Sequence, residues 1–154
     1  MKILWVIAVL SFLATSCGNN YQSTAKKETT SEDIKHEHDS DAATLELNNG
    51  DRWKADSSTN NNVKNLQGIV DKFKSSTDRS VNAYNSTGTE LQVGVNKMIS
   101  ECKMKGADHD ALHKWLEPMI SEIAKLQKSA NEQEAADVIK QIGEQLKQYQ
   151  QYFE

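Results

Sequence analysis

Sulfur and imidazole side chains gather within one short stretch of this 154-residue sequence. Together they supply a thiol, two thioethers and two imidazoles, and they are Met98, Cys102, Met104, His109 and His113. These are the ligand types that Cu(I) prefers, and imidazole combined with thiolate also suits Zn(II). The stretch therefore predicts a soft-metal site for copper or zinc, with the candidate ligands Cys102, Met104, His109 and His113.

The same side chains have a second interpretation, as part of an apolar helix face. Met98 and Cys102 are four residues apart and continue a stripe of apolar residues with helical spacing. Buried methionine and free cysteine are most often ordinary core residues. The sequence therefore leaves metal binding and packing open as alternatives for this cluster.

Familiar catalytic motifs are absent from the sequence. It has no Gly-rich phosphate loop, no Gly-x-Ser-x-Gly and no His-Glu-x-x-His. A cysteine-dependent enzyme that pairs Cys102 with His109 or His113 is the remaining catalytic alternative. Such an enzyme would also need a third group and an oxyanion site, and the sequence offers neither. We therefore expect a protein that is not an enzyme.

The first 17 residues have the pattern of an export signal. Lys2 provides a positive charge, an apolar run of 11 residues spans 3–13, and small residues lead to Cys17. The run is too short to cross a membrane, which takes about 20 apolar residues. Leu13-Ala14-Thr15-Ser16-Cys17 resembles the lipobox of bacterial lipoproteins. The resemblance implies that residues 1–16 are removed as a signal peptide and that Cys17 carries acyl chains such as palmitate.

The lipobox resemblance also implies a location. Several acyl chains on Cys17 would give stable membrane anchoring, whereas a single chain binds only weakly. Gly18 stands where lipoproteins retained at the inner membrane carry aspartate, so the resemblance favours the outer membrane. We expect a lipid-anchored protein of the cell envelope that faces the periplasm.

Charge and composition distinguish the segment that follows Cys17. Residues 18–43 contain three Lys, six acidic residues and no apolar periodicity. Such a segment buries too little apolar surface to offset the entropy of ordering it, so we expect 17–43 to be a lipidated N-terminus and a disordered tether. The net charge of the whole chain, -4, argues against a nucleic-acid partner because phosphate binding needs concentrated Lys and Arg.

Residues 44–56 have the pattern of a short β-hairpin. Leu45, Leu47 and Trp53 alternate with polar residues on either side of Asn49-Gly50. Asn and Gly tolerate the positive φ that a tight hairpin turn demands. A lone hairpin is marginally stable in water, so we expect these apolar side chains to lie against the helices that follow.

Residues 57–154 contain four stretches with apolar residues at helical spacing. The first two helices are expected at about 58–74 and 78–103. The third is expected after a cap at Asp108, and the fourth after a cap at Asn131. Amphipathic helices with short connections bury their stripes most simply as an antiparallel four-helix bundle, so the predicted fold class is all-α.

Four residues should disturb these helices or end them. Pro118 lacks a backbone donor, so it is expected to kink or restart the third helix. Gly88 and Gly94 should each weaken the second helix by up to about 1 kcal/mol relative to Ala. Gly106 is suited to a helix terminus, because it can adopt a backbone conformation that other residues rarely take.

Three segments together resemble a group of small uncharacterised exported proteins of Bacteroidetes-type bacteria. They are Leu47–Trp53, Cys102–Gly106 and His109–Leu116. The resemblance supports the helical architecture and implies no activity. With four amphipathic helices and no catalytic motif, we expect a binding or interaction module whose partner is another envelope protein or a second copy of the chain.

Overall fold

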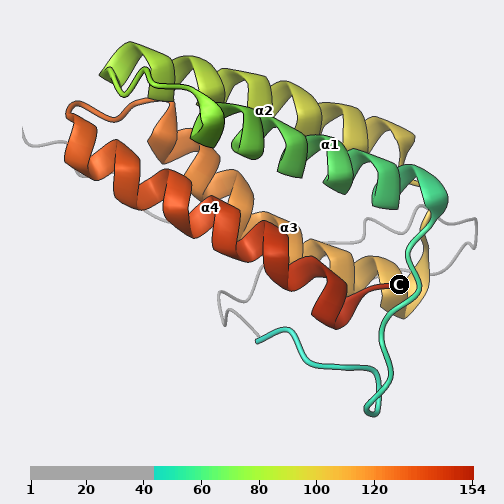
Figure 1. Ribbon diagram of the computed structural model, residues 1–154. Helices are drawn as coiled ribbons and strands as arrows, with labels where there is room; N and C mark the ends of the chain where they lie inside the picture. The colour runs from blue at the N-terminus through green and yellow to red at the C-terminus, as the bar shows by residue number, and fades with distance from the viewer. Residues whose placement is uncertain (1–43) are drawn as a thin grey trace, which may run out of the picture. The chain divides into compact units, whose positions relative to one another are not determined.

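The computed structural model of the chain describes residues 44–154, which contain four helices and no extended strand (Figure 1). The helices are α1 (Ser57–Ser75), α2 (Val81–Glu101), α3 (Gly106–Leu126) and α4 (Glu132–Tyr152). The prediction of an all-α fold with four helices is therefore confirmed for this part of the chain. The predicted signal peptide, Cys17 and the predicted tether lie outside the described residues.

The four helices pack as a bundle around one apolar core. Figure 1 shows α1 beside α2 and α3 beside α4, each pair joined by a short loop. Every helix contributes side chains that are completely buried, for example Leu66, Leu91, Met119 and Ile142. Burial of these stripes is the main force that holds the helices together. None of the helices in residues 44–154 combines the length and apolar character needed to span a membrane.

Polar side chains fix the starts of three helices. Oδ1 of Asp56 accepts the N–H of Thr59 at the start of α1. Oγ of Ser80 accepts the N–H of Ala83, so α2 begins at Val81 and not near residue 78. Asn131 caps α4 as predicted. Each of these caps satisfies a backbone donor that has no partner within its helix.

The start of α3 differs from the prediction. Asp108 lies inside the first turn and does not cap the helix, because α3 begins at Gly106, which adopts φ +63°, three residues before the start that a cap at Asp108 would give. Oδ1 of Asp108 instead accepts the backbone N–H of Lys54 at 2.9 Å. Of the two effects expected of Pro118, a kink or a restart, the restart is excluded, because α3 continues through it from Gly106 to Leu126.

Only the turn of the predicted hairpin is present. Asn48 and Asp51 exchange two backbone hydrogen bonds of 2.8 and 3.0 Å, and the residues between them, Asn49 and Gly50, both have positive φ. The flanking residues do not pair with each other. Trp53 forms a parallel bridge with Phe153 instead, so this segment is bonded to the end of the described chain.

The apolar residues of this segment have different surroundings. Leu45 and Trp53 are half-buried against the core, as expected, and Nε1 of Trp53 donates to the carbonyl of Glu46 at 2.7 Å. Leu47 is 42% exposed, so its predicted packing on the helices is wrong. The backbone of Trp53 pairs with the C-terminal end of α4, and Leu47 lies before the tight turn, outside that pairing.

Candidate functional site

The residues of the predicted soft-metal site lie where α2 leads into α3. Cys102 directly follows α2, and its backbone N–H donates to the carbonyl of Met98 at 3.0 Å. Gly106 opens α3 with positive φ, and α3 then passes beside α2. A pocket of about 50 Å³ between the two helices is lined by Met98, Ile99, Cys102, His109, Leu112, His113 and Leu116.

The two histidines of this pocket contact each other along α3. His109 and His113 are four residues apart, and their ring centroids are 4.5 Å apart with the planes at 82°. His113 is exposed, and its Nδ1 lies 3.6 Å from Oε1 of Glu117. His109 is half-buried. Both imidazoles therefore occupy one side of α3, at the edge of the pocket that Cys102 also lines.

The pocket does not have the arrangement of a preformed metal site. Cys102 is a half-buried free cysteine. Within residues 44–154, no three His, Cys, Asp or Glu side chains lie close enough together to hold a metal ion. Met104 is half-buried against the core and is not part of the pocket lining. The structure therefore brings Cys102, His109 and His113 to one pocket and leaves Met104 outside it.

Asp56 is an important residue at this end of the bundle that the sequence analysis missed. Its Oδ1 accepts the N–H of Thr59 at 2.6 Å, and its Oδ2 accepts the N–H of Lys103 at 2.7 Å. Burial raises the pKa of Asp56, but the backbone donors of Thr59 and Lys103 and the hydroxyl of Ser58 outweigh burial, and the pKa is lowered to about 2. The sequence could have predicted the cap, because an aspartate just before a helix is a common N-cap. It could not have predicted the bond from Asp56 to Lys103, because only the fold brings these two residues together.

Tyr149 places a neutral hydroxyl near the same end. Burial raises the pKa of the Tyr149 phenol well above its usual range, and the negative charge of nearby Asp56 raises it further. The hydroxyl donates to Oδ1 of Asn60 at 2.9 Å, which ties α4 to α1. A phenol that stays protonated is suited to hydrogen bonding and not to proton abstraction at neutral pH.

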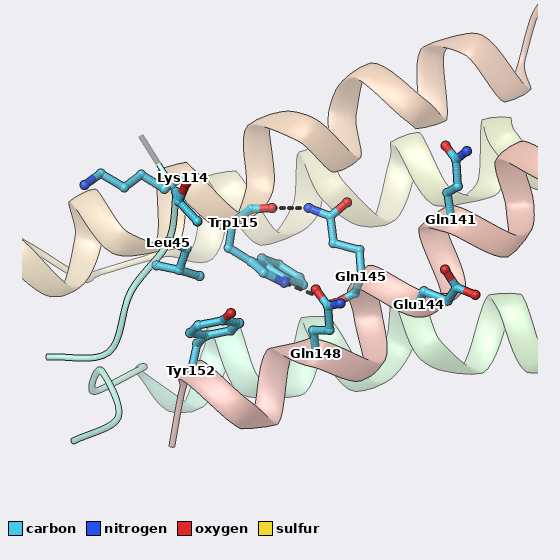
Figure 2. A pocket seen from close by; sticks show the side chains of 9 residues that line it. Leu45, Lys114, Trp115, Gln141, Glu144, Gln145, Gln148 and Tyr152 are labelled. Carbon is cyan, nitrogen blue, oxygen red and sulfur yellow. Dashed lines mark hydrogen bonds between the residues drawn. The ribbon is translucent and has the colours of Figure 1, made fainter. Parts of the chain in front are cut away.

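A larger hollow, of about 320 Å³, opens on the face formed by α3 and α4 (Figure 2). Three glutamine side chains dominate its polar lining, and a short piece of the segment before α1 closes one end. The lining residues are Thr44, Leu45, Lys114, Trp115, Gln141, Glu144, Gln145, Gln148 and Tyr152. The sequence does not indicate this site, because these residues show no motif and only helix packing brings them together.

Trp115 and Gln145 form the floor of this hollow. Figure 2 shows their reciprocal hydrogen bonds, in which the amide Nε2 of Gln145 donates to the carbonyl of Trp115 and Nε1 of Trp115 donates to the carbonyl of Gln145. These bonds hold α3 against α4. Gln141 and Gln148 are exposed beside them and can both donate and accept hydrogen bonds. Such a surface can form hydrogen bonds with the amides of a polypeptide, and Lys114 and Glu144 add one charge of each sign to it.

Comparison with protein families, with curated proteins and with solved structures yields no match to this chain. The chemistry of the described residues, together with the sequence patterns, is therefore the basis for the function proposed next.

Proposed function

We propose that this chain is a lipid-anchored protein of the cell envelope, and that its helices form an antiparallel bundle that serves as a non-catalytic binding module. The lipobox-like run from Leu13 to Cys17 carries the proposal, because it explains a short apolar run followed at once by a cysteine. Acyl chains on Cys17 would hold the protein on the periplasmic face of the outer membrane. Residues 17–43 would act as the tether between the lipid and the bundle.

The proposed partner is another protein of the envelope, and the proposed contact surface is the α3–α4 hollow. Gln141, Gln148 and Lys114 present amide and ammonium groups around it, and Trp115 gives it a rigid floor. These groups complement peptide amides and carboxylates. A second copy of the chain is the alternative partner. We do not expect a nucleic-acid partner, since the chain has a net charge of -4.

Membrane fractionation of cells that express the full chain tests the anchor. The wild type should be recovered with membranes, and a Cys17→Ser variant should remain uncleaved or lose its lipid. A Cys17→Ala variant, which also lacks the thiol, should behave in the same way. The proposed anchor would be wrong if the Cys17→Ser protein were still cleaved at the same bond and still carried lipid.

Site-specific photo-crosslinking in intact cells tests the binding surface. A photoreactive residue at Gln148 should yield a discrete crosslinked product, and the same residue at exposed Lys97 on α2 serves as the control position. A product of twice the chain mass would identify a second copy as the partner. Equal crosslinking from both positions, or none from Gln148, would exclude the α3–α4 hollow as the contact surface.

Soft-metal binding is the second candidate function, because Met98, Cys102, His109 and His113 line one pocket. In this proposal Cys102 and His109 supply the first two ligands to Cu(I) or Zn(II), and His113 and Met104 are the further ligands. Met104 would have to turn away from the core to take part. Thiolate coordination would also protect an unpaired cysteine in an oxidising compartment.

Metal titration of the lipidated protein under reducing conditions tests this second candidate. A site should bind about one Cu(I) or Zn(II) per chain and raise the melting temperature, because the metal binds the folded state. Both effects should disappear in Cys102→Ser and in His109→Ala. A Met119→Leu variant, altered in the core away from the pocket, serves as the control. Binding that survives in both ligand variants would exclude the site.

A further inference from the structure

A third hollow lies between α1 and α4 near the loop that joins α1 to α2, and it differs in character from the other two. Its volume is about 330 Å³. Its lining residues are Phe73, Lys74, Arg79, Tyr84, Ala136, Ile139, Lys140, Gly143, Glu144 and Lys147. The apolar members include Phe73 and Tyr84, whose ring centroids are 4.7 Å apart. The hollow therefore combines an apolar wall with a charged rim.

Positive charge is concentrated in this hollow. Four of the 18 Lys and Arg residues of the chain line it, against one of its 22 Asp and Glu residues. The chain as a whole is acidic, so this local excess is opposite in sign to the net charge. A pocket lined by like charges attracts ligands of the opposite charge.

The four cationic side chains of this hollow differ in the contacts that they make. Arg79 serves the structure, because its guanidinium donates to the carbonyl of Ser76 at 2.8 Å and lies over the Phe73 ring at 4.9 Å. Lys140 lies 4.0 Å from Glu144, both exposed to solvent, so this pair is weak. Lys74 and Lys147 have no ion-pair partner among residues 44–154. Their ammonium groups are therefore the ones free to bind a ligand.

Gly143 makes room for one of these ammonium groups. A side chain at position 143 would place its Cβ 3.1 Å from Nζ of Lys74, which is closer than most such contacts. Lys74, Gly143 and Lys147 also line an adjoining hollow of about 120 Å³, in which Asp71 is the one acidic residue beside the two lysines. Lys74 comes from α1 and Lys147 from α4, and the buried Val70 and Leu146 line the same hollow.

We propose that this α1–α4 groove binds an anionic amphiphile, a phosphate group attached to an apolar chain. Lys74 and Lys147 hold the phosphate, with Lys140 at the rim, and the apolar chain lies along Ile139 and the Phe73–Tyr84 pair. Ammonium groups recognise phosphate as point charges, and the apolar wall supplies the burial that inorganic phosphate cannot use. The proposal is independent of the lipid on Cys17 and of the α3–α4 contact surface.

Titration of the full chain, kept in solution with a neutral detergent, tests this site with two phosphate probes. Hexyl phosphate represents a soluble phosphate monoester, and dihexanoyl phosphatidylglycerol represents a lipid head group. Inorganic phosphate and hexyl glucoside are the matched controls, one lacking the chain and the other lacking the charge. The readout is the NMR shift of the Gly143 amide and of the methyl groups of Ala136 and Ile139.

We expect saturable shifts with at least one phosphate probe and much weaker shifts with both controls. The double variant Lys74→Gln/Lys147→Gln should weaken binding by about tenfold or more, since it removes two charged hydrogen-bond donors. Lys105→Gln, at the other end of the bundle, should leave binding unchanged. Tighter binding of the monoester supports a soluble ligand, and tighter binding of the lipid supports a membrane head group.

Three results would overturn the proposal. The first is the absence of saturable shifts with both phosphate probes. The second is equal binding by wild type and the double variant, with circular dichroism showing that both are folded. The third is equal affinity for inorganic phosphate and hexyl phosphate, which would show that the apolar chain does not contribute to binding.

Discussion

The carboxylate of Asp56 is bonded to the backbone of Lys103, 47 residues later in the chain, at 2.7 Å. Its other oxygen caps α1 through Thr59. The neighbouring N–H of Lys54 donates to Asp108 in the first turn of α3 at 2.9 Å. Residues 54–56 therefore fasten the start of α1 to the α2–α3 loop, which carries Cys102 and the pocket beside it.

Replacing Asp56 should destabilise the bundle, although Asp56 is only partly buried and lies just before α1. Asp56→Ala removes a helix cap and one interloop bond, and we expect the free energy of unfolding to fall by about 1–2 kcal/mol. Urea denaturation followed by far-ultraviolet circular dichroism measures this change. Asp110→Ala, which removes an exposed carboxylate in α3, should alter it by less than about 0.5 kcal/mol. Equal effects of the two variants would show that neither the cap at Thr59 nor the bond to Lys103 contributes measurably.

The contribution of Asp56 should depend on pH in a defined direction. Its pKa is lowered from 3.8 to about 2 in the folded state, so the carboxylate stabilises the fold fully above pH 3.8. This contribution is lost as the pH falls toward 2, because between the two pKa values the unfolded chain binds a proton that the folded protein does not bind. The difference in unfolding free energy between wild type and Asp56→Asn should shrink over that interval. A difference that stays constant from pH 6 down to pH 2 would contradict the role of the charge.

Local signals in the sequence predicted the helices better than they predicted the contacts between them. The cap at Asn131 was readable because its partner, the N–H of Glu134, is three residues away. The role of Asp108 was not readable, because its partner Lys54 reaches it only through the fold. For the same reason Asn49-Gly50 predicted a tight turn correctly, whereas the pairing of Trp53 with Phe153 could not be foreseen.

In the candidate sites, too, local spacing was predictable from the sequence and contacts between distant segments were not. His109 and His113 are four residues apart, a spacing that puts two side chains on one side of a helix, and their rings are in contact. Met104 follows α2 in an irregular loop, where no periodicity indicates which way its side chain points. The linings of the α3–α4 hollow and the α1–α4 groove combine residues from distant segments, so no pattern in the sequence predicted either.

Gly88 has a packing role that its low helix propensity conceals. A Cβ at this position would lie 3.0 Å from the backbone nitrogen of Gln127, and a backbone atom cannot move aside cheaply. We expect Gly88→Ala to lower the unfolding free energy by about 1–3 kcal/mol despite the better helix propensity of Ala. Thermal denaturation measures the change.

Gly68 provides the matched control for Gly88. It also lies inside a helix, but nothing lies within 4 Å of the position that its Cβ would occupy. Gly68→Ala should therefore stabilise the protein by up to about 1 kcal/mol. If Gly88→Ala were as stabilising as Gly68→Ala, the close approach of Gln127 would not be the reason why position 88 requires glycine.

Phe153 should be one of the most important side chains for stability. It is 1% exposed, and its ring stacks on Tyr149 with centroids 4.8 Å apart. Phe153→Ala should lower the unfolding free energy by about 3–5 kcal/mol, because it leaves a cavity and removes the stacking contact. Tyr152→Ala, at the adjacent half-exposed position, should cost clearly less in the same urea titration. A smaller loss at Phe153 than at Tyr152 would contradict the packing described for this end of the bundle.

Intact-mass spectrometry of the protein extracted from membranes tests most directly whether the bundle is lipid-anchored. The predicted species begins at Cys17, lacks residues 1–16 and exceeds the mass of residues 17–154 by a diacylglyceryl group or by that group and a further acyl chain. Treatment with alkali should remove the ester-linked acyl chains and lower the mass accordingly. A chain that begins at another residue, or one that begins at Cys17 with a free thiol, would contradict the proposed anchor.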